Sequence, residues 1–316
     1  MFKRLGLSLL CLLPLIASAA KDNAATVPFK VIQVSAHAYY VQGQSGPASS
    51  ANQGFMSNAG FVITPAGVVV FDSLGTPPLA DLLIAEIHKR TQAPIKRVIV
   101  SHYHADHVYG LQPLKAAGAE IWAHEAGKAY LNSDDLERRL TQRREDLFPW
   151  VDETTQVLPA DVWLTGDTDF ELGGLHFAVR YVGPAHSPED IALFVKEDSV
   201  LFAGDLVFKG RVPFVGAADS KAWLASLDKL LAFHAKIMVP GHGSVSRNPK
   251  TDLNLTRNYL SYLRKTMGLA VNDLTPFEEA YAHTNWKQFE KLPAFKEANR
   301  PNAYNTYILM EKESLK

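Results

Sequence analysis

Short apolar runs bounded by turn residues recur along the first two-thirds of the chain, and each predicts a strand. They include Phe29–Ile32, Ala38–Val41 and the pair Gly60–Ile63 and Val68–Phe71, which flanks a Thr-Pro-Ala-Gly turn typical of a hairpin. Val98–Val100 is β-branched and bounded by polar residues, as expected of a buried strand. Similar runs follow at 171–172, 177–182, 191–195, 200–203 and 237–239.

Segments with apolar residues at helical spacing lie between these runs. Residues 79–91 and 219–234 each place large apolar side chains on one face and predict amphipathic helices. Residues 125–147 also predict a helix, but their charges of both signs are typical of a solvated face. Strands that alternate with helices indicate a layered α/β fold.

Residues 249–316 are predicted to be mainly helical and to pack on the same domain. Helices are expected at 249–268, from the capped start Thr275-Pro276-Phe277-Glu278, at 285–292 and at 302–312. As an alternative, we expect Arg300, Asn302 or Tyr304 to reach the pocket and hold the substrate.

Residues 1–20 have the features of a secretory signal peptide. Lys3 and Arg4 precede an apolar stretch from Leu5 to Ile16, and small residues follow it. The stretch is too short to be a comfortable membrane span. We therefore expect a periplasmic or secreted protein that is not inserted in the membrane once the signal is cleaved.

Composition narrows the range of functions. Cys11 is the only cysteine and leaves with the signal, so the mature chain has no thiol nucleophile and no thiolate metal ligand. Cleavage removes two basic residues and no acidic one, which changes the net charge from -1 to -3. This charge does not favour nucleic acid or an anionic membrane surface, and we expect a small-molecule substrate.

The run at 98–100 leads into Ser-His-Tyr-His-Ala-Asp-His, residues 101–107, which is the strongest chemical signal in the chain. His102 and His104 are two residues apart, so an extended segment aims both the same way. Asp106 and His107 require the chain to turn. Imidazole and carboxylate are ligands of borderline metals such as zinc. The segment therefore predicts two adjacent metals and supplies ligands to both.

Three further strands end in residues of the same kinds, at His186, Asp205 and His242. Strand ends of layered α/β folds are where ligand sites gather, so His or Asp at four of them predicts one metal site. Asp72 also ends a strand. We expect it either to support a ligand histidine or to cap the turn that follows.

Residues 42–58 are rich in Gly, Ser, Gln and Asn and predict a flexible loop. The loop is either a plain connector or a lid, in which case Phe55 and Met56 contact the substrate. His124 ends another strand, where we expect a structural role.

The motifs across residues 60–243 resemble those of the metallo-β-lactamase superfamily of metallohydrolases. The resemblance implies an α/β fold of the four-layer αββα sandwich type over residues 21–248. Residues 249–316 would form a C-terminal helical extension packed on the same domain.

Three segments resemble a narrower group within the superfamily, the periplasmic quinoprotein relay system zinc metallohydrolases. They are Asn58–Phe61, Gly183–Asp190 and residues 204–216. Members of this group are found beside periplasmic dehydrogenase systems, so the resemblance implies a periplasmic redox system as a partner.

Carried over position by position, the resemblance implies two zinc ions per chain. The first would be bound by His102, His104 and His186, the second by Asp106, His107 and His242, with Asp205 bridging them. Two zinc ions that share a water lower its pKa towards about 7, so hydroxide forms near neutral pH. The implied function is an exported hydrolase acting on an ester, thioester, lactone or amide. Asp106 would orient the nucleophile or take its proton. Iron or manganese is not excluded, because the same ligands suit those metals.

Departures from the superfamily patterns limit the substrate. The lack of cysteine excludes the β-lactamase subclass with a cysteine ligand, and Asp205 argues against the subclass with a His-rich second site. Val108-Tyr109-Gly110 stands where hydroxyacylglutathione hydrolases usually carry paired glycines. The full ligand set argues against single-iron sulfur dioxygenases. The alternatives left are β-lactamase activity and a non-catalytic metal-binding accessory protein of a periplasmic redox system.

Overall fold

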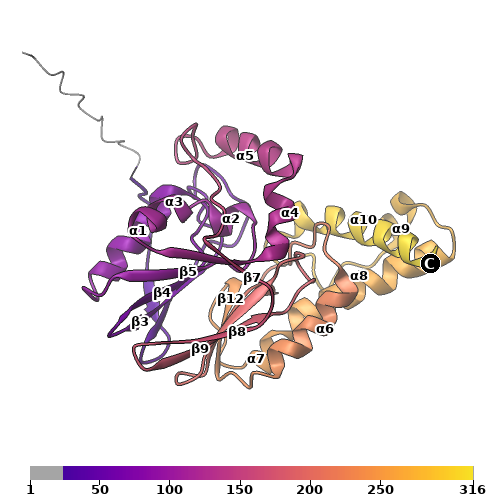
Figure 1. Cartoon of the computed structure of the whole chain (residues 1–316). Coiled ribbons are helices and arrows are strands. Elements are labelled where there is room, and N and C mark those ends of the chain that lie inside the picture. Colours follow the sequence, from indigo (N-terminus) through magenta and orange to yellow (C-terminus); the bar gives the residue numbers. More distant parts are fainter. Residues whose placement is uncertain (1–23, 316) are drawn as a thin grey trace, which may run out of the picture.

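The computed structural model describes residues 24–315, and within them two β-sheets face each other between outer layers of helices (Figure 1). The predicted signal peptide lies outside the described residues. The first sheet runs in chain order through β1 (Val31–Gln33), β2 (Ala38–Val41), β3 (Ala59–Thr64), β4 (Gly67–Phe71), β5 (Ile95–Ile99), β6 (Glu120–His124) and β7 (Val162–Leu164). The second has the order β12-β11-β10-β9-β8 and contains β8 (Thr168–Leu172), β9 (Leu175–Tyr181), β10 (Ile191–Val195), β11 (Val200–Phe208) and β12 (Ile237–His242).

Strand β4 shows why the sheets stack between helices. Every residue of β4 is buried, because its two faces pack on different cores. Val69 and Phe71 face the second sheet, where the ring of Phe71 lies 5.6 Å from that of Phe202. Val68 and Val70 belong to the core beneath the helices. The αββα sandwich predicted from the sequence is confirmed.

Helices cover the outer face of each sheet. Residues of α1 (Pro77–His88) and α3 (Leu111–Ala116) share a core with the first sheet, and those of α6 (Ser220–Leu231) and α8 (Asn254–Asn272) share one with the second. The remaining helices are α2 (Ala105–Val108), the 3-10 turn η1 (Glu125–Gly127), α4 (Lys128–Leu131), α5 (Asp134–Asp146), α7 (Pro249–Asp252), α9 (Phe277–His283) and α10 (Phe295–Ser314). Across residues 24–315, none of the helices has the length and apolar character needed to span a bilayer.

Three of the predicted helices differ clearly from the structure. The single helix expected at 125–147 is divided into η1, α4 and α5. The helix expected at 285–292 is wrong, because that segment consists of turns that bury Phe289. The helix expected at 302–312 begins earlier, at Phe295, and continues through Pro301. Proline lacks the backbone N–H and usually ends a helix. Here burial of Ala298 and Ala303 in the second core outweighs that loss.

Candidate metal centre

Strands of both sheets and the loops after them bring the predicted ligands together at one edge of the sandwich. Asp205 was expected at a strand end, but β11 continues past it to Phe208, so Asp205 lies within the strand. The segment after β5 supplies the first motif, the loop after β9 supplies His186, and β11 and β12 supply Asp205 and His242. The ligand atoms form two groups, one of His102, His104, His186 and Asp205, the other of Asp106, His107 and His242. All predicted site residues therefore meet, and their roles as ligands stay a prediction.

The imidazoles of the first group converge on one point. His104 Nδ1 lies 3.0 Å from His102 Nε2 and 2.8 Å from His186 Nε2. Burial lowers the pKa of His102 and His104 well below the ordinary value, and it lowers that of His186 to about 4. Neutral imidazoles are the form that binds a metal, so the group is ready to act as a ligand set.

Asp205 lies between the two groups. Its Oδ2 is 3.4 Å from His186 Nε2, and its Oδ1 is 3.1 Å from His107 Nε2 and 3.2 Å from His242 Nε2. Asp106 belongs to the second group alone, with Oδ2 at 3.3 Å from His242 Nε2. One carboxylate thus spans both groups, which is the arrangement expected of a bridging ligand.

Three buried polar atoms, two of the second group and one of Asp205, lack hydrogen-bond partners. They are Asp106 Oδ2, His107 Nε2 and Asp205 Oδ1. Such atoms are rare in folded proteins, and a shared cation would satisfy all of them at once. Burial lowers the pKa of His107, but the carboxylates of Asp205 and Asp106 outweigh it and raise the pKa well above the ordinary value. A metal would displace that proton. The residues therefore fit two metal ions.

Asp72 holds one histidine of each group in place. Its Oδ2 accepts hydrogen bonds from His107 Nδ1 at 2.8 Å and from Ser101 Oγ at 2.9 Å. Ser101 Oγ lies in turn 2.9 Å from His102 Nδ1. A proton fixed on Nδ1 leaves Nε2 free for a metal. Of the two predicted roles for Asp72, the support of a ligand histidine is the one that the geometry shows.

The loop at residues 42–58 is anchored on the site. His242 Nδ1 donates to the Met56 carbonyl oxygen at 2.7 Å, and Ser57 Oγ donates to the Asp106 carbonyl oxygen. Met56 lines the cleft above the metal groups, as the lid hypothesis predicted. Phe55 was expected there too, but it is buried in the core and stacks on Phe29.

A cleft of about 200 Å³ opens above the metal groups. Its wall is partly apolar, and its charged side chains outside the metal groups are Arg139, Arg143, Arg211 and Glu297. A side arm of about 460 Å³ shares His104, Arg139 and Phe214 with the cleft. Phe214 therefore stands at the junction, with its ring 6.3 Å from that of His104.

The C-terminal residues named from the sequence do not line this cleft. Arg300 pairs with a glutamate of α9, Asn302 bonds to the backbone of the loop before α6, and Tyr304 packs on α9. Helix α10 reaches the cleft one to two turns earlier, through Glu297 and Ala298. The sequence did not identify Arg139 and Arg143, although their four-residue spacing on a helix is a usable signal for a shared face.

A family model described as the metallo-beta-lactamase superfamily matches residues 52–242. A linear primary-alkylsulfatase from Pseudomonas sp. is 28% identical over 251 residues, which cover 68% of this chain and 47% of that protein. The metallo-beta-lactamase type 2 of Bacillus cereus is 27% identical over 194 residues, which cover 60% of this chain and 68% of that protein.

Solved structures show the same fold. The stereoselective inverting sec-alkylsulfatase Pisa1 from Pseudomonas sp. aligns with a TM-score of 0.70 at 17% identity, over 88% of this chain and 50% of that one. A metallo-beta-lactamase from Pontibacter korlensis aligns with a TM-score of 0.57 at 21% identity, over 74% of this chain and 99% of that one. The chain thus spans about half the length of the alkylsulfatases it matches.

Proposed function

Because the chain belongs to the metallo-beta-lactamase superfamily and is a metal-dependent hydrolase, we propose that it cleaves an ester, thioester, lactone or amide with two zinc ions. The observation that carries the two-metal proposal is the position of Asp205. Its Oδ2 faces His186 at 3.4 Å and its Oδ1 faces His107 at 3.1 Å. A site for a single metal has no need of a carboxylate between two ligand groups.

Two zinc ions held by these groups would supply a hydroxide nucleophile near neutral pH. The chain's own residues would set the geometry. The Asp106 side chain is 18% exposed, against 4% for Asp205, and it lines the cleft. Asp106 is thus placed to orient the attacking water and to accept its proton. Met56 and Phe214 would provide apolar walls that limit the access of bulk water.

A panel of esters, thioesters, lactones and amides tests the proposal. We expect the zinc-loaded protein to turn over at least one class with saturable kinetics. Asp205→Ala should lower kcat/KM by at least about 100-fold. Removing a residue that only orients a metal ligand already costs about 10–100-fold in activity, and Asp205 is proposed to bind the metals itself. Metal retention with no turnover of any class would instead favour the non-catalytic accessory protein.

Two relatives suggest narrower substrates as second candidates. β-Lactams follow from the similarity to the Bacillus cereus enzyme, and alkyl sulfates follow from the similarity to the alkylsulfatase. Slow turnover of nitrocefin would not favour the first, because metal-activated hydroxide is promiscuous. Only kcat/KM at or above about 10⁴ M⁻¹ s⁻¹, the lower end for natural substrates, would support either candidate.

We also propose that the protein is exported and acts beside a periplasmic redox system. The signal-like residues 1–20 support export, and the segments that resemble quinoprotein relay metallohydrolases support the partner. Cell fractionation and N-terminal sequencing of the full chain expressed in a Gram-negative host test the first point. A cytoplasmic protein with an intact N-terminus would contradict it.

A further inference from the structure

Two arginines of helix α5 line the cleft above the metal centre. The sequence pattern predicted a solvated helix, and Arg138 fits that prediction, with a side chain that is 77% exposed and paired with Asp135. Arg139 and Arg143 are four residues apart and share another face, and both line the cleft together with His104 and Asp106. The mixed-sign helix therefore has an outer face of ion pairs and an inner face of arginines.

The three arginines of the cleft differ in the hydrogen-bond and ion-pair partners that the protein gives their side chains. Arg211 is buried and lies 3.4 Å from the carbonyl oxygens of Gly46 and Val212. Arg143 lies 3.8 Å from Asp146 on its own helix. For Arg139, no carboxylate among residues 24–315 comes within ion-pair distance. Among the described residues Arg139 has neither an ion pair nor a hydrogen bond, whereas Arg211 has carbonyl partners and Arg143 has a carboxylate nearby.

Arg139 also occupies the branch point of the cleft. It lines both the space above the metal groups and the side arm, and so does His104. Its charge acts on His104, whose pKa is lowered first by burial, then by His186 and then by Arg139. A molecule bound in either space can therefore contact this guanidinium.

A second unpaired donor lies beside Arg139. The Tyr130 side chain lines the side arm, and its hydroxyl is buried with no hydrogen-bond partner. Burial raises the pKa of the Tyr130 phenol, and Arg139 is the nearby charge that most opposes the rise. The phenol therefore keeps its proton and remains a hydrogen-bond donor.

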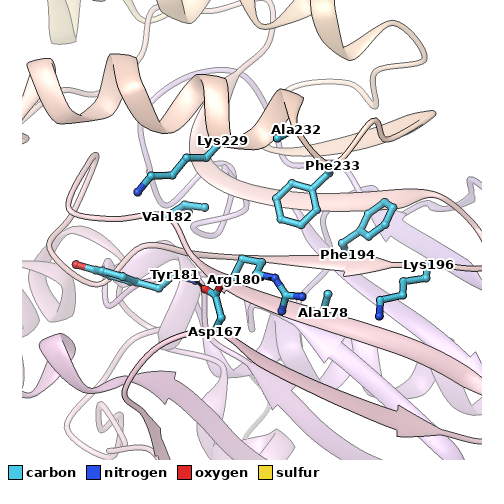
Figure 2. Close-up of a pocket in the computed structure, with 10 residues that line it drawn as sticks. All are labelled: Asp167, Ala178, Arg180, Tyr181, Val182, Phe194, Lys196, Lys229, Ala232 and Phe233. Atoms are coloured by element: carbon cyan, nitrogen blue, oxygen red, sulfur yellow. Dashed lines mark hydrogen bonds and ion pairs between the residues drawn. The ribbon is translucent and has the colours of Figure 1, made fainter.

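Another hollow with basic side chains shows the contrast. It has a volume of about 430 Å³ and lies between the outer face of the second sheet and the end of α6 (Figure 2). Its Arg180 is paired with Asp169 at 2.7 Å and lies 3.6 Å from Asp167. Phe194 and Phe233 face each other in it, with ring centroids 5.3 Å apart. None of the metal-group residues lines this hollow.

We propose that Arg139, assisted by Arg143, binds an anionic group of the substrate and so selects for organic anions. Guanidinium groups pair with carboxylate or sulfate oxygens through two parallel hydrogen bonds. Glu297 in the same cleft disfavours a group with two negative charges. The substrate is then either an ester or related acyl compound that carries one carboxylate, or a sulfate ester. In both cases it has an apolar segment that packs on Phe214. This inference rests on the proposed hydrolase function.

Paired substrates test the selection directly. The anionic ester is mono-para-nitrophenyl glutarate, and its neutral partner of similar length is para-nitrophenyl pentanoate. We expect the zinc-loaded wild type to prefer the anionic ester. The ratio of kcat/KM for the anionic over the neutral ester should fall about 10-fold in Arg139→Gln, mainly through KM, as expected for one charge-assisted pair. Arg139→Lys should fall between the wild type and Arg139→Gln, because lysine keeps the charge but not the paired hydrogen bonds. An unchanged ratio in Arg139→Gln would overturn the proposal.

Arg138→Gln is the matched control, because it removes a neighbouring charge from the exposed face of the same helix. Its ratio should equal that of the wild type, and an equal fall in both variants would reduce the effect to net charge and overturn the proposal. The alternative that the anionic group is a sulfate ester is tested with para-nitrophenyl sulfate. Turnover of that compound above both esters, lost in Arg139→Gln, would assign the arginine to a sulfate group.

Binding separates this inference from the hydrolase proposal. Calorimetry of the zinc-loaded protein with phenoxybutyrate, which has no hydrolysable bond, needs no turnover. We expect Kd to rise about 10-fold in Arg139→Gln and to stay constant in Arg138→Gln. If no compound of the ester, thioester, lactone and amide panel is cleaved but this difference appears, the hydrolase proposal fails and the anion site stands. Equal binding by the wild type and Arg139→Gln shows that the ligand is held elsewhere, for example on the metals, and refutes the anion site.

Discussion

Replacing Asp72 by asparagine should weaken metal binding without unfolding the protein. The carboxylate is buried and accepts hydrogen bonds from Ser101 N at 2.7 Å, Ser101 Oγ at 2.9 Å and His107 Nδ1 at 2.8 Å. Asparagine has the same shape and keeps one acceptor oxygen. If that oxygen stays on the Ser101 N–H, the amide nitrogen faces His107. The amide can then pair with His107 only when the imidazole proton moves to Nε2, the nitrogen that faces the metal groups.

The size of the effect follows from the contact that is lost. A charge-assisted hydrogen bond contributes about 1.5–3 kcal/mol, which corresponds to roughly 10–100-fold in affinity. Zinc titration of the metal-free protein against a competing chelator measures both binding steps. We expect the step that uses His107 to weaken by that factor in Asp72→Asn. Asp228→Asn, an exposed change on α6, should bind zinc like the wild type. Wild-type affinity for both ions in Asp72→Asn would refute the orienting role of Asp72.

Two further changes test the surroundings of the site. In Gly241→Ala the new methyl group would overlap the Asp205 carboxylate and the Gly204 backbone. Elemental analysis should therefore find fewer metal ions per chain. A full complement of metal would contradict the close packing of β11 on β12. In Asn58→Ala the buried carbonyl groups of Pro240 and Gly243 lose the donor that lies 2.7 and 2.8 Å away, which should lower the free energy of unfolding in urea by at least about 2 kcal/mol. A loss below about 0.5 kcal/mol would show that these carbonyl groups find other partners.

The meeting of the candidate ligands at one site could be predicted because its signal is local. Each ligand follows an apolar run, and strand ends of a layered fold meet at one edge. Residue type and position in the chain therefore sufficed for His186, Asp205 and His242, which lie far apart in sequence. Asp72 was predictable in the same way, but the choice between its two roles required the distance to His107.

The walls of the cleft could not be predicted, because they depend on how helices are placed in three dimensions. The charge pattern of α5 predicts an exposed helix, and it does not say that Arg139 faces inward while Arg138 faces out. For α10 the sequence pointed to Asn302, whose amide is used to hold the loop before α6. Glu297 reaches the cleft instead, since the helix begins before Pro301 rather than after it.

The measurement that tests the two-metal site most directly is the metal content of the purified mature protein, with Asp205→Ala in parallel. Elemental analysis should find two zinc ions per chain in the wild type, because Asp205 lies between two complete ligand groups. The content should fall in Asp205→Ala, since the carboxylate serves both groups. One iron ion per chain, or two zinc ions retained in Asp205→Ala, would contradict a bridged dinuclear zinc centre.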